Sequence, residues 1–428
     1  MSFAVFFSLF AIGLGYLLFK RLYNHITLYS FIWGVELLVF HSDLIKYRDL
    51  SGNTLLLIYG SWILLILASG ITKYIMPNEN EVKKGPEYDI GVVRNVLLVM
   101  IVLGGIGTFQ HWLVILGKFG SFKEVIINGI KIYQMRVDGE LTEMVPYLTG
   151  FNTSGSFFGV YYAAKSKRFK LLGIIPILLV ILNSIAIFGR ANMINSAILW
   201  GTSYFLATKP IKIFSYSFIK KIATLLFIGV FIIKAFELIR ANRGTIEHFE
   251  GQTREMQEIK QFGGFITPSI VLYVSSHIGV LDKYLFYKTE KNRPDNKPVG
   301  GNSFASFYRI SSKIGFTDPI PKRRTFYNVP AQVNTGTYLR DLYSDFGLVG
   351  TLIGVILLGV VTTFVYVKYV STNNIIYLFI TSYVFLVVFF SFAILAIQQG
   401  TWVFSFLMTF IAMLFIEKFG KNKTQNSA

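Results

Sequence analysis

The sequence contains no cysteine among its 428 residues, which excludes disulfide bridges, thiolate nucleophiles and cysteine-ligated metal sites together. Charged residues are also scarce, at 15% of the chain. No HExxH or DxD pattern occurs, and the glycine-rich run from Gly104 to Gly107 lies inside an apolar stretch, where it indicates close helix packing and not a phosphate loop. We therefore expect neither a metal ion nor any other cofactor.

Apolar residues, in contrast, make up 53% of the chain, and the mean hydropathy is +0.54. This composition predicts an all-α polytopic membrane protein, because a bilayer crossing needs about 20 mostly apolar residues and a helix pairs its own backbone polar groups. We predict about eleven transmembrane helices. They cover residues 2–19, 26–41, 54–72, 90–110, 147–164, 171–189, 192–208, 221–239, 346–367, 374–397 and 401–417.

The basic residues of the short connections indicate how these helices are oriented. If the N-terminus lies outside and the C-terminus inside, the short outer connections carry only Lys46, Arg48 and Arg190, as the positive-inside rule requires. Basic residues of the inner connections include Lys20, Arg21, Lys73, Lys83, Lys84, Lys165, Lys167, Arg168, Lys170, Lys209, Lys212, Lys220, Lys221, Lys368, Lys418, Lys421 and Lys423. These lysines face anionic lipid heads and account for most of the net charge of +18, so we expect no nucleic-acid partner.

One long polar stretch interrupts the hydrophobic spans. We predict an N-terminal transmembrane bundle over residues 1–239, an extracytoplasmic loop over 240–345, a C-terminal transmembrane bundle over 346–417 and a cytoplasmic basic tail over 418–428. Within the loop, residues 252–261 alternate in charge and predict a solvated helix that Gly263 and Gly264 end. Residues 265–287 predict a re-entrant or surface-lying helix.

Several polar residues fall at the predicted outer ends of helices and suggest a hydrophilic cavity at the outer leaflet. They are Glu36, His41, Gln110, His111, Arg190, Glu237, Arg240, Arg243, Gln398 and Gln399. An ionisable group within a span is costly unless it is paired or hydrated, so Glu36 and Glu237 should face the bundle or the cavity. For any single residue, however, snorkelling or local pairing is an equally good explanation.

The polar stretch begins with Glu237, Arg240 and Arg243 at three-residue spacing, close to one helical face. Arginine forks match phosphate oxygens in pairs. The alternative is an interfacial anchor in which the two arginines pair with Glu237 and Glu247.

The stretch ends in a segment that predicts a helix start followed by an apolar helix. Asn334 to Thr337 supply hydroxyl caps, and Thr337, Asp341 and Asp345 follow one another at four-residue spacing, so they share one stripe. Such a stripe alone is most often simple capping and anchoring at the membrane interface.

At this segment the chain resembles a known family. Asn334-Thr-Gly-Thr337, Tyr343-Ser-Asp345-Phe-Gly347 and Gly350, opening an apolar helix after a long outward loop, are similar to the bacterial oligosaccharide repeat-unit polymerases, the Wzy-type O-antigen and capsule polymerases. Phe188-Gly189-Arg190 and the Arg240/Arg243 pair are similar to that family's recurrent arginines.

The resemblance implies a metal-independent glycosyltransferase with an architecture like that of the C-type glycosyltransferases. Such an enzyme joins oligosaccharide units carried on undecaprenyl pyrophosphate, at the outer face of the bacterial cytoplasmic membrane. The implied partners are this lipid-linked oligosaccharide, membrane lipid, a chain-length regulator and a flippase.

This chemistry assigns roles to particular residues. Arg190, Arg240 and Arg243 are expected to stabilise the departing diphosphate. His277, Asp341 and Asp345 are the candidates for the base that accepts the proton of the incoming sugar hydroxyl. Asn334, Thr337, Arg340 and Tyr343 are expected to bind substrate.

Two other functions share this architecture. An O-antigen ligase uses the same donor with another acceptor, although the segment 334–350 favours a polymerase. A lipid-linked oligosaccharide flippase or other transporter would share the hydropathy, but transporters usually show paired halves, and the sequence has no such repeat.

Overall fold

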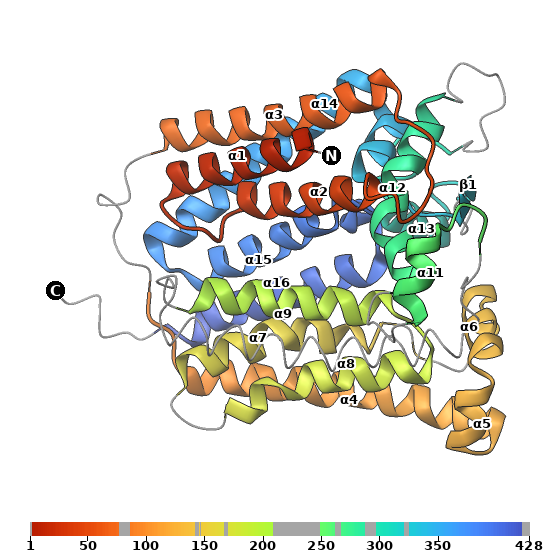
Figure 1. Cartoon of the computed structure of the whole chain (residues 1–428). Helices are drawn as coiled ribbons and strands as arrows, with labels where there is room; N and C mark the ends of the chain where they lie inside the picture. Colours follow the sequence, from red (N-terminus) through yellow and green to blue (C-terminus); the bar gives the residue numbers. More distant parts are fainter. Residues whose placement is uncertain are drawn as a thin grey trace. The chain divides into compact units, whose positions relative to one another are not determined.

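The computed structural model of the chain describes residues 2–76, 86–141, 145, 147–166, 170–208, 249–261, 267–286, 297–320 and 325–421. This part of the chain is mostly helical (Figure 1). Four of the described helices are long and apolar enough to cross a membrane, and they are α3 (Gly52–Ile75), α4 (Ile90–Phe119), α14 (Tyr338–Thr372) and α16 (Gly400–Phe419). Shorter apolar helices include α1 (Ser2–Phe19), α2 (His25–Phe40), α8 (Ile175–Ala186) and α15 (Ile375–Phe390). The predicted fold class is confirmed to the extent that the described chain is mostly helical and contains helices that could cross a membrane. The predicted number of eleven crossings remains a prediction.

The remaining elements are shorter or more polar. They are α5 (Phe122–Ile127), α6 (Gly129–Asp138), α7 (Gly150–Lys165), η2 (Lys170–Gly173), α9 (Ala191–Ala207), α11 (Arg254–Gln261), α12 (Pro268–Phe286), α13 (Ala305–Lys313), β1 (Tyr327–Val329), β2 (Ala331–Val333) and η4 (Ala396–Gln398). The strands form an antiparallel hairpin in which Asn328 pairs with Gln332. The predicted helices at 252–261 and 265–287 are confirmed as α11 and α12, while the predicted span 221–239 and the stop at Gly263 and Gly264 lie outside the described residues.

Contacts divide the chain into two compact units, each assembled from separate stretches of sequence. Unit 1 contains residues 1–82, 246–370 and 387–400, and unit 2 contains residues 83–245, 371–386 and 401–428. The predicted boundaries after residues 239, 345 and 417 divide the chain by its position relative to a membrane, not by contacts. They therefore stay a prediction.

In unit 1, α14 packs against α2 and α3 through buried polar pairs set in an aromatic core. The hydroxyls of Tyr29 and Tyr338 are 3.1 Å apart, and His25 Nε2 lies 3.0 Å from the hydroxyls of both Ser69 and Thr363. Trp62 donates from its indole nitrogen to Ser30 at 2.8 Å. These hydrogen bonds satisfy polar groups that an apolar interior would otherwise penalise.

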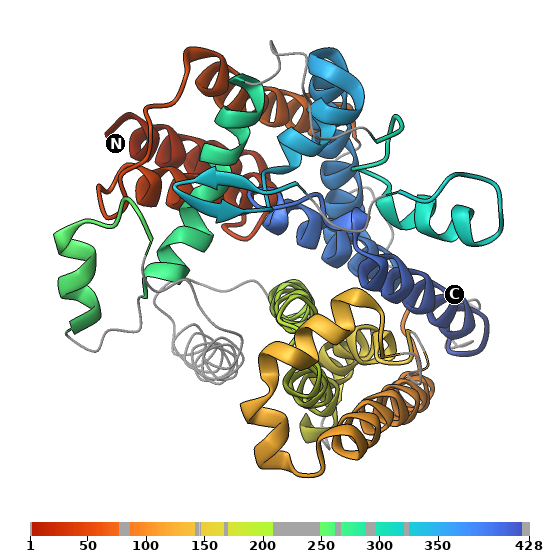
Figure 2. The same ribbon diagram turned by 90° about the vertical axis from the view of Figure 1, so that its right-hand side faces the viewer.

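The polar elements of unit 1 gather at one end of α2 and α3 (Figure 1). The β-hairpin lies against α12, as Figure 2 shows from that end. Gly279 of α12 makes this approach possible, because a Cβ at this position would collide with Val329. Helix α12 also packs on α2 and α3, so it joins the polar stretch to the apolar helices.

Helix α14 is broken near its start. Gly347 has φ 66° and ψ −166°, a conformation that is accessible essentially to glycine alone. The predicted cap is confirmed, because the Thr337 hydroxyl accepts a hydrogen bond from the Arg340 backbone N–H at 3.3 Å. The segment from Tyr338 to Phe346 is thus a separate helical piece that precedes the apolar part of α14.

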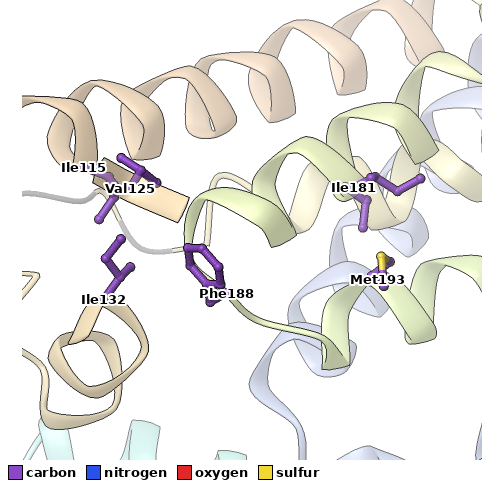
Figure 3. Close-up of a cluster of buried hydrophobic side chains, with 7 residues drawn as sticks. Ile115, Val125, Ile132, Ile181, Phe188 and Met193 are labelled. Carbon is purple, nitrogen blue, oxygen red and sulfur yellow. The ribbon is translucent and has the colours of Figure 1, made fainter. Parts of the chain in front are cut away.

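Unit 2 contains α4, α7, α8, α9 and α16. Helix α7 contacts α4, α8 and α9, and η2 approaches α7 so closely that Gly159 and Gly173 meet backbone to backbone. Short helices α5 and α6 close one end of this unit over a buried apolar cluster (Figure 3). The cluster consists of Ile115, Val125, Ile132, Val180, Ile181, Phe188 and Met193.

Candidate functional site

The segment that carries the resemblance folds against the middle of α12. His277 is fully buried, and its Nδ1 lies 3.1 Å from the Thr335 hydroxyl. The imidazole ring makes edge contacts with the rings of Tyr273 and Phe392, at 5.4 Å between centroids in both cases. The predicted site residues His277 and 334–337 are therefore neighbours, although they are about sixty residues apart in sequence.

Asp341 joins the start of α14 to the stretch 395–398 within unit 1. One carboxylate oxygen accepts a hydrogen bond from Arg340 at 3.1 Å. The other accepts from the Leu395 backbone N–H at 3.2 Å and from the Gln398 side chain at 2.7 Å. Asp341 is fully buried and Arg340 is only 3% exposed, so this is a buried ion pair with its remaining lone pairs satisfied.

Arg340 is enclosed by the polar segment. Its guanidinium lies 5.9 Å from the centroid of the Tyr327 ring on β1. Gly336 leaves room for the same side chain, because a Cβ at this position would lie only 3.0 Å from Arg340 Cδ and Nε. Tyr343 lies nearby, with its ring 6.5 Å from that of Tyr284 on α12. Asn334 is half-buried at the start of this segment.

Asp345 fixes a turn of the polar stretch. Its two oxygens accept hydrogen bonds from the backbone N–H groups of Asn302, at 3.1 and 3.2 Å, and Ser303, at 2.6 Å. The Asn302 side chain donates to it as well, at 3.1 Å. This geometry is that of a residue that positions a loop.

Glu36 of α2 lies inside unit 1, as the cost of a buried charge predicts. It is 1% exposed on a helix that packs against α12. Its carboxylate faces the backbone of Ile278 on α12.

The predicted arginines lie elsewhere or outside the described residues. Arg190 belongs to unit 2, where it is the N-cap of α9 and lies in sequence between Phe188 and Met193 of the apolar cluster in Figure 3. Arg136 of α6 lies directly against Gly189, so this turn brings a second arginine that the sequence did not suggest. Arg240 and Arg243 lie outside the described residues.

A basic pocket of 320 Å³ lies on another face of α12 and was not predicted. It is lined by Phe40, Lys46, Tyr47, Arg48, Gly279, Asp282, Lys283, Phe286, Asn328, Val329 and Pro330. The rings of Phe40 and Tyr47 stack at 4.4 Å, and the Arg48 guanidinium lies 4.7 Å from the centroid of Phe286. Burial raises the pKa of Tyr47 above its ordinary value, so its hydroxyl stays protonated next to Ser275, 2.7 Å away.

The signal for this pocket was present in the sequence. Lys46-Tyr47-Arg48 alternates cations with an aromatic ring, but the positive-inside argument treats Lys46 and Arg48 only as exceptions in a short connection. Lys283 comes from a segment more than 230 residues away, and only the packing of α12 against the connection brings it there.

The described residues contain no group of three or more histidine, aspartate or glutamate side chains placed to hold a metal ion. No family model matches this chain, and no curated protein or solved structure is similar to it.

Proposed function

We propose that this chain is a membrane glycosyltransferase that polymerises undecaprenyl-pyrophosphate-linked oligosaccharide repeat units at the outer face of a bacterial cytoplasmic membrane. The observation that carries the proposal is a junction in unit 1 made by two contacts, one between His277 and Thr335 and one between Asp341 and Gln398. It brings together the polar stretch, the segment 334–350 that resembles the polymerases and the turn before α16. Architecture supports the same function, because the apolar helices provide access for a lipid-linked substrate.

The reaction would proceed by displacement at the anomeric carbon of the growing chain. The acceptor hydroxyl oxygen forms the new bond to that carbon, and the bond to the diphosphate oxygen breaks with its electron pair leaving on the diphosphate. The hydroxyl proton passes to a protein base.

Among the three candidate bases, we assign this role to His277. The carboxylates of Asp341 and Asp345 already accept several hydrogen bonds that hold loops in place, whereas a neutral imidazole has a ring nitrogen that can accept a proton. Asp341 and Asp345 are then positioning residues.

The test is a gel of surface glycan from a strain lacking this chain. Loss of the polymer ladder with a single repeat unit retained is the result expected. Accumulation of lipid-linked polymer with no attachment would instead indicate a ligase, and repeat units trapped on the inner leaflet would indicate a flippase. Either outcome would replace the proposal.

Complementation with variants tests the arginines. Arg190→Ala and Arg240→Ala are expected to abolish high-molecular-weight glycan while the protein still inserts at normal levels. Arg309→Gln, at an exposed position of α13, serves as the control. A normal ladder from both alanine variants would remove these arginines from the diphosphate site.

A further inference from the structure

We propose that the basic pocket beside α12 binds a diphosphate group attached to an apolar chain, and that Lys46, Arg48 and Lys283 are its ligands. The assignment of this diphosphate to the lipid-linked acceptor unit rests on the proposed function, in which Arg190, Arg240 and Arg243 take the diphosphate of the donor. The pocket itself is argued from charge, packing and position.

The cations of this pocket come from two segments of the chain. Within the described residues, neither Lys46 nor Arg48 forms an ion pair. Lys283 donates a hydrogen bond to the Asn328 carbonyl at 3.1 Å, which points its ammonium group toward the hairpin that closes the pocket. Three cations from two separate segments therefore converge on one cavity of 320 Å³, a size typical of small-molecule sites.

The carboxylate in the pocket wall is engaged by the start of α3. One Asp282 oxygen accepts hydrogen bonds from the Ser51 backbone, the Ser51 hydroxyl and the Thr54 hydroxyl, at 2.9, 2.7 and 2.7 Å. Three cations and one carboxylate leave a net charge of +2 around the cavity. A diphosphate esterified at both ends carries two negative charges, and its oxygens can accept from lysine and from the arginine fork together.

The remaining walls are apolar and lie at the ends of α2 and α12. Phe40 is the last residue of α2, and Phe286 is 52% exposed at the end of α12. Val329 and Pro330 of the hairpin complete this wall. A phosphate group bound here would thus have an apolar surface beside it that an attached hydrocarbon chain could cover.

The loop that carries Lys46 and Arg48 is held firmly. The Lys46 backbone N–H donates to the Gly251 carbonyl at 2.8 Å, and Ile45 is buried against Met256 and Leu272. Ser51, at the end of the loop, is fixed by Asp282. Both cations are therefore presented by a preorganised backbone, which lowers the entropic cost of binding.

Binding to the purified full-length protein tests the inference. In nanodiscs of phosphatidylcholine, we expect farnesyl diphosphate to bind more tightly than farnesyl monophosphate, and inorganic pyrophosphate to bind more weakly than either prenyl ligand. Lys46→Gln, Arg48→Gln and Lys283→Gln should each weaken farnesyl diphosphate about tenfold, since each removes one charge-assisted contact. Arg309→Gln removes an equal charge from the same unit and should leave the affinity unchanged.

Three results would overturn the pocket assignment. Equal affinities of all three pocket variants and the parent protein would mean that diphosphate binds elsewhere. An equal loss in the Arg309→Gln control would mean that only the general positive charge matters. Competition by nanodiscs of phosphatidylglycerol as effective as that by farnesyl diphosphate would mean that the pocket takes an ordinary phospholipid head group.

The outcomes also separate this inference from the proposed function. If diphosphate binding depends on the pocket but the strain lacking the chain has a normal glycan ladder, the pocket assignment holds and the polymerase function is rejected. If the ladder is lost but the pocket variants bind diphosphate normally, the polymerase function holds and the pocket assignment is rejected.

Discussion

One carboxylate oxygen of Asp282 accepts hydrogen bonds from both the backbone N–H and the hydroxyl of Ser51, at 2.9 and 2.7 Å. Ser51 is the N-cap of α3, and Asp282 lies near the end of α12, 231 residues later in the sequence. A negative charge at a helix N-terminus is favoured by the helix dipole and by the unpaired N–H groups of the first turn. The contact therefore fastens the polar stretch to the start of an apolar helix.

Replacing Asp282 by alanine should destabilise the protein by about 2 kcal/mol, because α3 loses a charged cap at Ser51 and the buried hydroxyl of Thr54 loses its acceptor. The measurement is unfolding of the detergent-solubilised protein by titration with dodecyl sulfate. Asp318→Ala changes the same charge at an exposed position and should leave the transition in place. Coincident transitions for all three proteins would show that Asp282 contributes nothing to stability.

Asp341→Asn should cost about 3 kcal/mol, since it breaks a buried ion pair with Arg340. Whichever way the new amide is oriented, its NH₂ group faces either Arg340 or the donors of Leu395 and Gln398. The same titration measures the loss. Asp341→Asn combined with Gln398→Ala should recover part of it, because one opposed donor has been removed; an additive loss would contradict the geometry.

Gly347→Ala should destabilise the protein by about 1–3 kcal/mol through backbone strain alone. No heavy atom lies within 4 Å of the Cβ position, so a steric clash does not contribute. Gly70 of α3 has equally open space and lies in a regular helix, so Gly70→Ala should be neutral or stabilising by about 0.5–1 kcal/mol. Equal effects of the two substitutions would rule out a break in α14 at Gly347.

Asp345→Ala should release the turn at Asn302 and Ser303, whose backbone N–H groups would lose their acceptor. Hydrogen exchange followed by mass spectrometry should show these amides exchanging at least tenfold faster. A tenfold increase corresponds to a fall of about 1.4 kcal/mol in the free energy of local opening. Peptides from α3 serve as the internal reference and should keep their rates. Unchanged protection at residues 302 and 303 would mean that Asp345 does not hold the turn.

The sequence predicted the helices better than the site. Hydropathy located α1 and α3 to within a few residues, as 2–19 and 54–72, because a membrane helix must be both long and apolar. It missed one end of three others: α4 runs on to Phe119, α14 begins at Tyr338, and α15 ends at Phe390. It did not predict the break at Gly347, since a glycine inside an apolar run is as often a packing position as a bend.

Residues close in sequence to the motif were predicted together, whereas distant partners were not. The stripe of Thr337, Asp341 and Asp345 follows from helical spacing, and the Thr337 cap follows from residue type. The partners Gln398 and Asn302 depend on tertiary packing, which one sequence does not reveal. For the same reason Lys46, Arg48 and Lys283 were never considered together as a pocket.

The contacts in unit 1 join segments that the predicted topology places on one side of the membrane. Asp282 and Ser51 are both predicted to be outside, as are Asp341 and Gln398. The Tyr366 hydroxyl donates to the Tyr23 carbonyl at 2.9 Å, and both of these residues fall at predicted inner ends. Labelling from a single side of the membrane therefore tests the orientation of the whole unit.

A membrane-impermeant maleimide should label Lys313→Cys in intact cells and should label Tyr74→Cys only after the membrane is permeabilised. Lys313 is exposed at the end of α13 in the predicted outer stretch, and Tyr74 is 90% exposed at the predicted inner end of α3. The natural chain has no cysteine, so each variant carries one thiol and the parent protein is an unlabelled control. The reverse pattern would place the basic pocket and the His277 junction in the cytoplasm, where a glycan polymerase of the outer face could not use them.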